Sequence, residues 1–115
     1  MQGKRLDRVN QLIKEEISTL LHRELKDPRL GFVTVTEVET SKDLRQAKIF
    51  VSVLGNEGQW KSSMAALESA KGFVRNWLRQ NLDLRVTPEL DFRADHSLEH
   101  AARIQSLLRK VQPNS

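Results

Sequence analysis

The apolar residues of this chain change period along the sequence, and this change restricts the fold more than any other feature. From about Arg5 to Leu25 they recur at steps of three and four residues, the spacing of one helical face. The Lys-Asp-Pro sequence that ends at Pro28 stops this helix, because residues before proline avoid the helical region. From Phe32 to Thr40 and from Ala47 to Leu54, β-branched and alternating apolar residues predict two strands.

The two strands are expected to form a hairpin, because Ser41–Asp43 between them has the composition of a turn. The alternation in the first strand changes parity, since Val33 and Val35 share a face that Val38 does not. A β-bulge near Glu37 explains this change.

The second half of the chain is predicted to contain two helices, a strand and a last helix. The pattern is helical from about Gln59 to Leu82, with a break expected at Gly72, where glycine costs about 1 kcal/mol relative to alanine. Thr87–Ala94 alternates as a third strand. A helix with one apolar stripe follows from about Ser97 or Leu98 to Val111.

This order of elements predicts an α+β fold, with one three-stranded sheet covered by helices on one face. A chain of 115 residues fits one domain, placed at 1–111, with a frayed, flexible tail at 112–115. Aromatic residues make up 5%, so the core must be aliphatic. The absence of cysteine excludes disulfides and thiolate metal sites. No apolar run reaches the ~18 residues that span a bilayer, so we expect a cytoplasmic protein without a membrane partner.

Basic residues concentrate where the helix break is expected. The net charge is +4 and the isoelectric point about 9.8, as in many nucleic-acid-binding proteins. Lys71, Arg75 and Arg79 are four residues apart, so they form one stripe on a helix, and Arg85 extends it. Like charges at this spacing destabilise a helix, and an RNA backbone would offset the cost. The alternative is a solvated face with acidic neighbours in space.

A second basic group, Lys4, Arg5 and Arg8, lies at the start of the first helix. The helix dipole disfavours cations at this end, which again favours an external anionic partner. Ordinary fraying of the N-terminus is the alternative explanation.

Gly55–Gly58 matches the GxxG pattern with which one class of RNA-binding domain clamps a nucleic-acid backbone. Here the pattern follows a strand and contains Glu57 instead of a cation. A loop turn is therefore the preferred interpretation.

His96–His100 matches H-x-x-E-H, a pattern of zinc proteases, and taken alone would indicate a hydrolase that uses His96, Glu99 and His100. A catalytic zinc also needs a third protein ligand and a cleft, so no metal site is predicted. Trp60 and Trp77 could stack on bases, but their helical spacing with other apolar residues favours the core.

Several motifs together resemble the ribosome-binding factor A family, bacterial factors of small-subunit assembly. The likeness covers nearly the whole chain in the right order. Its most specific pieces are ELKDPR, VTVTEVE, S-x-D-L-x-x-A-K, and R-x-TPEL-x-F followed by D-x-S-x-E.

The resemblance implies a single type II KH-like domain in the order α-β-β-α-kink-α-β, plus a C-terminal helix. In this family a helix–kink–helix with an Ala-x-Gly motif replaces the glycine clamp, and here the motif is Ala70-Lys71-Gly72. It also implies binding to the free small (30S) ribosomal subunit, assistance in late 16S rRNA maturation, and a role in growth in the cold. The family's RNA face corresponds to Lys71, Arg75 and Arg79.

The sequence therefore predicts a monomeric RNA-binding protein that uses no cofactor, has no small-molecule substrate and is not an enzyme. An interaction module for an acidic protein partner is the alternative function. The candidate RNA-binding residues are Lys71, Arg75, Arg79, Arg85, Lys4, Arg5 and Arg8, with the kink at Ala70 and Gly72.

Overall fold

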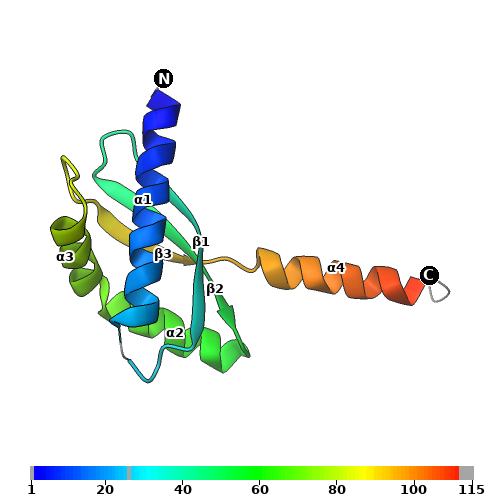
Figure 1. The fold of residues 1–115 in the computed structure, drawn as a ribbon. Coiled ribbons are helices and arrows are strands. Elements are labelled where there is room, and N and C mark those ends of the chain that lie inside the picture. Colours follow the sequence, from blue (N-terminus) through cyan, green and yellow to red (C-terminus); the bar gives the residue numbers. More distant parts are fainter. Residues whose placement is uncertain (1, 26, 112–115) are drawn as a thin grey trace.

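The computed structural model describes residues 2–25 and 27–111, and its elements follow the predicted order (Figure 1). In chain order they are α1 (Gln2–Arg23), β1 (Phe32–Thr40), β2 (Gln46–Leu54), α2 (Glu57–Ser69), α3 (Lys71–Asn81), β3 (Glu89–Ala94) and α4 (Ser97–Val111). The predicted α+β class with a three-stranded sheet is confirmed. The predicted tail, 112–115, lies outside the described residues.

The sheet is mixed, with β2 between the other two strands. β1 and β2 form the predicted antiparallel hairpin, whereas β3 runs parallel to β2 because α2 and α3 form the crossover between them. The register shifts between Val35 and Glu37, which confirms the predicted bulge. The bulge lets Val38 point to the buried face together with Val33 and Val35.

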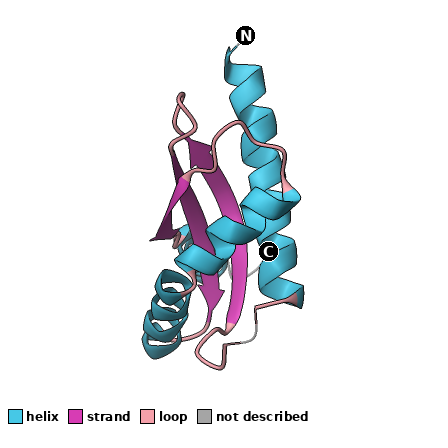
Figure 2. Cartoon of the chain, turned by 90° about the vertical axis from the view of Figure 1, so that its left-hand side faces the viewer, coloured by secondary structure: helices cyan, strands magenta, loops and turns pink. Residues whose placement is uncertain are grey.

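Three helices cover one face of the sheet, and Figure 2 shows the strands as one twisted layer beside them. α1 packs on β1, α2 packs on β2 and β3, and α3 contacts α1 and β3. The side chains buried between these layers are mainly aliphatic, as predicted; the large ones with almost no exposed surface are Ile13, Ile17, Leu20, Ile49, Val51, Val53, Leu67, Val74 and Leu78. Each contributes roughly 1.5–3 kcal/mol through burial.

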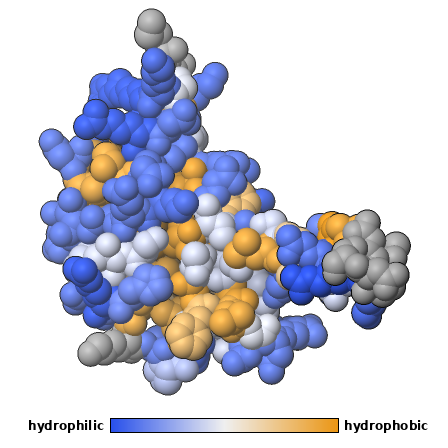
Figure 3. Space-filling view, turned by 45° about the vertical axis from the view of Figure 1, so that its right-hand side comes forward, coloured by the Kyte–Doolittle hydropathy of each residue, from blue (hydrophilic) through white to orange (hydrophobic). Residues whose placement is uncertain are grey.

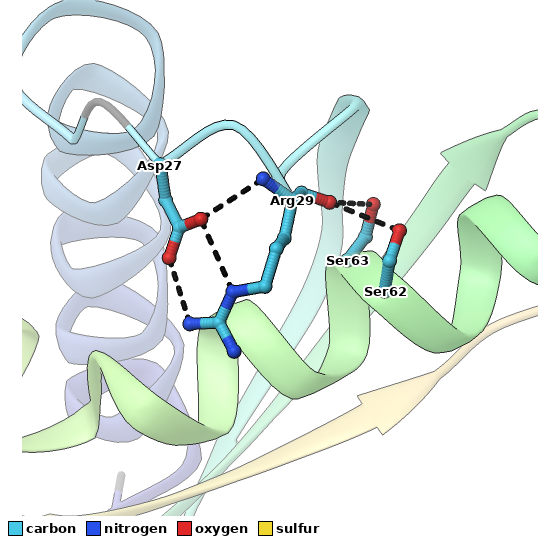
Figure 4. Close-up of polar contacts among 4 residues, drawn as sticks. All are labelled: Asp27, Arg29, Ser62 and Ser63. Atoms are coloured by element: carbon cyan, nitrogen blue, oxygen red, sulfur yellow. Dashed lines mark hydrogen bonds and ion pairs between the residues drawn. The ribbon is translucent and has the colours of Figure 1, made fainter.

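Hydrogen bonds connect the loop between α1 and β1 to α2 (Figure 4). The backbone carbonyl of Arg29 accepts hydrogen bonds from the hydroxyls of Ser62 at 3.1 Å and Ser63 at 3.4 Å. Asp27 accepts a hydrogen bond from the Arg29 guanidinium at 2.8 Å, which lowers the pKa of the Asp27 carboxyl. The Arg29 side chain is therefore engaged within its own loop.

The predicted break between α2 and α3 is present and lies at Ala70, one of the two residues predicted for the kink, between Ser69 and Lys71. Ala70 has φ −89° and ψ 0°, a right-handed helical conformation, and Val74 donates its N–H to the Ala70 carbonyl at 2.9 Å. Gly72 lies in the first turn of α3 without a positive φ, and a Cβ there would meet no atom within 4 Å. The expectation of a break centred on Gly72 is corrected, because the change of helix direction does not use glycine's conformational freedom.

α4 projects from the body of the molecule (Figure 1). The radius of gyration is 16.5 Å, larger than the ~13 Å of a compact domain of this length. The large residues Leu98, Ile104 and Leu108 of the predicted apolar stripe of α4 are exposed, as is Leu107, which the prediction did not include. Figure 3 shows apolar side chains gathered on the adjoining part of the body, where Phe32 and Leu54 are more than three-quarters exposed. None of the described helices is both long enough and apolar enough to cross a membrane.

Candidate nucleic-acid interface

The α3 stripe, which comprises Lys71, Arg75 and Arg79, lies along one side of α3 as its spacing predicts. Lys71 Nζ lies 2.7 Å from a carboxylate oxygen of Glu68, one turn earlier. Arg79 donates a hydrogen bond to Asn76 Oδ1 at 2.6 Å. Lys71 thus has the acidic neighbour that the alternative interpretation expected. Exposed pairs of this kind contribute little to stability, so Lys71 can exchange Glu68 for another anion.

Arg75 ties α3 to the chain just before β3. Its guanidinium donates to the backbone carbonyl of Thr87 at 3.0 Å and to that of Pro88 at 3.2 Å, and it lies 3.6 Å from Glu89. These contacts use Nε and Nη2 of the guanidinium, and no hydrogen bond to the described residues uses Nη1. Arg75 therefore has a structural role, and its contact with RNA stays a prediction.

A second group of cations surrounds a hollow beyond the C-terminal end of α3. This basic hollow has a volume of about 370 Å³ and is lined by Arg5, Leu6, Lys42, Asp43, Leu44, Arg45, Arg85 and Val86. It joins the start of α1, the β1–β2 turn and the α3–β3 loop, which meet near one end of the molecule (Figure 1). Among the residues that the structure describes, no carboxylate forms an ion pair with Arg5, Lys42 or Arg85.

The β1–β2 turn is held in place by its own hydrogen bonds. Ser41 Oγ donates to Asp43 Oδ1 at 2.7 Å, which is the main cause of the lowered pKa of Asp43, and the Arg45 N–H donates to the same oxygen at 3.1 Å. The Asp43 carboxylate lies 3.8 Å from the Arg45 guanidinium. Leu44 has φ 61°, a left-handed conformation that costs an L-residue roughly 1–2 kcal/mol. Such a conformation persists only where the surroundings enforce it, so the turn is rigid.

The sequence predicted two of the four cations of the basic hollow, Arg5 and Arg85, and missed Lys42 and Arg45. Lys42 and Arg45 were missed because their place in the hollow depends on the parallel pairing of β2 with β3, in which the Glu89 N–H donates to the Arg45 carbonyl at 2.8 Å. This pairing brings the hairpin turn next to the loop that contains Arg85. Recognising that crossover in the sequence would have been enough to find it.

Lys4 and Arg8 lie beside Arg5 on α1 and are exposed. They do not line the basic hollow, and no carboxylate among the described residues pairs with them. They add positive charge to the end of the molecule where the hollow opens.

Gly55 and Asn56 form the turn into α2, as preferred from the sequence, whereas Glu57 and Gly58 already belong to the helix. Asn56 caps the helix by accepting the Gln59 N–H at 2.9 Å, and the Gln59 side chain accepts the Asn56 N–H at 2.7 Å. This reciprocal capping box uses the N–H groups that a phosphate clamp would need. Gly55 has φ 151°, so glycine is required there by the backbone.

The His96–His100 motif is involved in holding the base of α4. Glu99 accepts a hydrogen bond from Trp60 Nε1 at 2.8 Å, and its other oxygen lies 3.3 Å from His96 Nδ1. The described residues contain no group of three side chains placed to hold a metal ion. Trp60 is buried and Trp77 packs against the same core, which confirms the core role predicted for both.

Comparisons with known proteins agree with this architecture. The profile of the family described as ribosome-binding factor A matches residues 5–108. Ribosome-binding factor A of Halothermothrix orenii is 50% identical over 112 residues, which are 97% of this chain and 92% of that protein.

Two Thermus thermophilus structures are also similar. The crystal structure of its ribosome-binding factor A has a TM-score of 0.70 and 25% identity, over 77% of this chain and 94% of that chain. A homology model of ribosome binding factor A from the same organism, fitted into a cryo-EM map of a 30S–RBFA complex, has a TM-score of 0.64 and 25% identity, over 76% of this chain and 91% of that chain. This chain therefore belongs to the ribosome-binding factor A family and has its KH-like fold.

Proposed function

We propose that this chain is a cytoplasmic, monomeric factor that binds the free small (30S) ribosomal subunit and assists late maturation of its 16S rRNA without catalysis. Membership of the ribosome-binding factor A family supports the proposal, as does the Thermus thermophilus relative fitted into a 30S complex. The contact with the subunit is made through RNA.

The observation that carries this proposal is the convergence of four cations around the basic hollow with a single carboxylate, Asp43. Cations collected from three segments of the fold form a positive surface that fits the phosphates of folded RNA. If about four cations meet phosphates, binding should weaken with salt at a log–log slope of about −3.

Binding alone is sufficient for such a role. A protein that prefers one conformation of immature rRNA shifts the population toward that conformation by its difference in affinity. Neutralised phosphates repel one another less, so RNA segments can approach closely while the protein is bound. No bond needs to be made or broken.

Co-sedimentation with purified small subunits tests the binding. The protein should sediment with free small subunits, and nuclease digestion of the rRNA should release it. An association that survives complete digestion would instead support the alternative, an acidic protein partner.

Depletion of the protein from its cells tests the maturation role. Small subunits carrying unprocessed 16S rRNA ends should accumulate, and growth should slow more in the cold than at the optimal temperature. Normal processing at both temperatures would contradict this part of the proposal.

A further inference from the structure

We propose that the basic hollow holds the sugar–phosphate backbone of a single RNA strand, irrespective of base sequence. The phosphate clamp of this KH-like domain would then lie at the hairpin turn and not at the α2–α3 break. This inference rests on the proposed RNA-binding function, and it specifies which part of the RNA is held and where.

At the α2–α3 break, both backbone groups of Ala70 are already hydrogen-bonded. The Ala70 N–H donates to the Ala66 carbonyl at 3.0 Å, and the Ala70 carbonyl accepts the Val74 N–H. Lys71, the cation next to the break, is paired with Glu68 at 2.7 Å. The backbone groups of Ala70 are therefore bonded within the protein and Glu68 offsets the charge of Lys71, although no side chain caps the N–H groups at the start of α3.

The basic hollow has the opposite properties. Arg5, Lys42 and Arg85 pair with no carboxylate among residues 2–25 and 27–111, so their charges need not leave a partner to bind phosphate. The carboxylate of Asp43 accepts from Ser41 and from the turn backbone, which keeps it in the turn. Because the turn is fixed, little conformational entropy is lost on binding.

The size and lining of the hollow indicate the ligand. Its volume of about 370 Å³ is near the lower end of small-ligand sites, so it can enclose a nucleotide unit of one strand but not a duplex. Leu6, Leu44 and Val86 provide aliphatic contacts for a ribose between the cations. No aromatic side chain of the described residues lines the hollow, so it lacks the stacking platform on which bases are held. The hollow is therefore expected to recognise the sugar–phosphate backbone of the RNA and not its bases.

The test compares two double variants that each remove two positive charges. The hollow variant is Arg45→Gln with Arg85→Gln. The control is Lys61→Gln with Arg93→Gln, two exposed cations outside the hollow that pair with Glu57 and Asp91. Fluorescence anisotropy with short oligo(U) and oligo(A) strands, over a range of salt concentrations, gives affinity and salt slope. Thermal unfolding checks that both variants fold.

The hollow variant should bind both strands roughly tenfold more weakly for each cation lost, with a salt slope about 1.4 smaller than that of the wild type. The control should lose less than about threefold, with its slope unchanged. The wild type should bind oligo(U) and oligo(A) within about threefold of each other, and 5′-phosphorylated and 5′-hydroxyl strands equally.

Three results would overturn the inference. The first is equal affinity of the hollow variant and the control, and the second is a tenfold difference between oligo(U) and oligo(A). The third is a marked preference for the 5′-phosphorylated strand, which would assign the hollow to a terminal phosphate.

Co-sedimentation separates this inference from the proposed function. If the wild type binds small subunits through RNA and the hollow variant binds them as well as the control does, only the inference about the hollow is wrong. If the hollow variant alone loses the oligonucleotides and the wild type does not bind subunits, only the proposed function is wrong.

Discussion

The α3 stripe and the basic hollow differ in how their cations came together. The α3 stripe comes from one helix, so its spacing is visible in the sequence. Within α3, the same spacing places Asn76 one turn from Arg79, and this pair forms. Lys71 pairs with Glu68, three residues earlier at the end of α2. The basic hollow collects its cations from three segments, and three of the four have no ion-pair partner among the described residues.

This difference has a physical cause. A helix that brings cations close to one another also brings them close to the polar residues three and four positions away. Of the cations that the tertiary fold brings together in the basic hollow, only Arg45 has such a local partner among the described residues, Asp43. A charge pattern that is conspicuous in a sequence is therefore not the best guide to the charges that are free to bind a ligand.

The largest expected difference between the α3 stripe and the basic hollow is in the free energy of unfolding. Arg75→Ala removes the hydrogen bonds to the Thr87 and Pro88 carbonyls and should lower the free energy of unfolding by about 2 kcal/mol. Arg85→Ala should change it by less than about 0.5 kcal/mol. Urea denaturation measures both. If Arg75→Ala is as stable as the wild type but binds RNA poorly, Arg75 is an RNA contact and the distinction between the regions fails.

A smaller effect is expected when the α3 stripe itself loses charge. Lys71→Gln with Arg79→Gln should weaken binding to single-stranded RNA by about threefold, because Lys71 must leave Glu68 before it can meet a phosphate. The hollow variant with the same change of net charge should lose far more. Fluorescence anisotropy measures the RNA affinity of the two variants. Equal losses of affinity would show that the α3 stripe contributes as much to RNA binding as the basic hollow.

The smallest effect is expected at Asp43, the one carboxylate of the basic hollow. Asp43→Asn keeps an acceptor for Ser41 and removes a negative charge, so RNA affinity should rise about twofold. The Ser41 hydroxyl holds the pKa of Asp43 below its usual value of 3.8, so the carboxylate stays ionised throughout the neutral range. The twofold gain should therefore be constant between pH 5 and 8, and a gain that disappears toward pH 5 would contradict this assignment.

The same lowered pKa fixes how Asp43 affects stability. A carboxyl group whose pKa is lower in the folded state than in the unfolded state stabilises the fold above the unfolded pKa. This contribution is lost as the pH falls through the folded pKa. The wild type should therefore lose its stability advantage over Asp43→Asn only below about pH 4.

Local pattern was sufficient to predict most of the fold. The period of the apolar residues predicted the helices and strands, and the change of parity at Val38 predicted the bulge between Val35 and Glu37. The period of the apolar residues did not predict that the apolar stripe of α4 is exposed. It shows which residues share a face of the helix, but not whether another element packs on that face. Ile104, in the middle of that apolar stripe, is 44% exposed.

The candidate site was less predictable, for a related reason. Arg5 and Arg85 were identified from local charge, but their meeting with Lys42 and Arg45 depends on the parallel pairing of β2 and β3. The carbonyl partners of Arg75 depend on the same long-range packing of α3 beside the start of β3. Neither arrangement can be read from the spacing of charged residues alone, and the first would have required recognising the crossover from β2 to β3.

The bulge in β1 determines where this strand can change in length. Thr36 is the additional residue, since Val35 is paired with Val51 and Glu37 with Phe50. Loss of Thr36 or of Glu37 would straighten the strand and leave its valines on the core side, whereas loss of Thr34 would turn Val35 outward. Deletions that natural selection tolerates in this strand should therefore fall only at Thr36 and Glu37, and libraries of single-residue deletions should show these two adjacent permissive positions inside an otherwise intolerant segment.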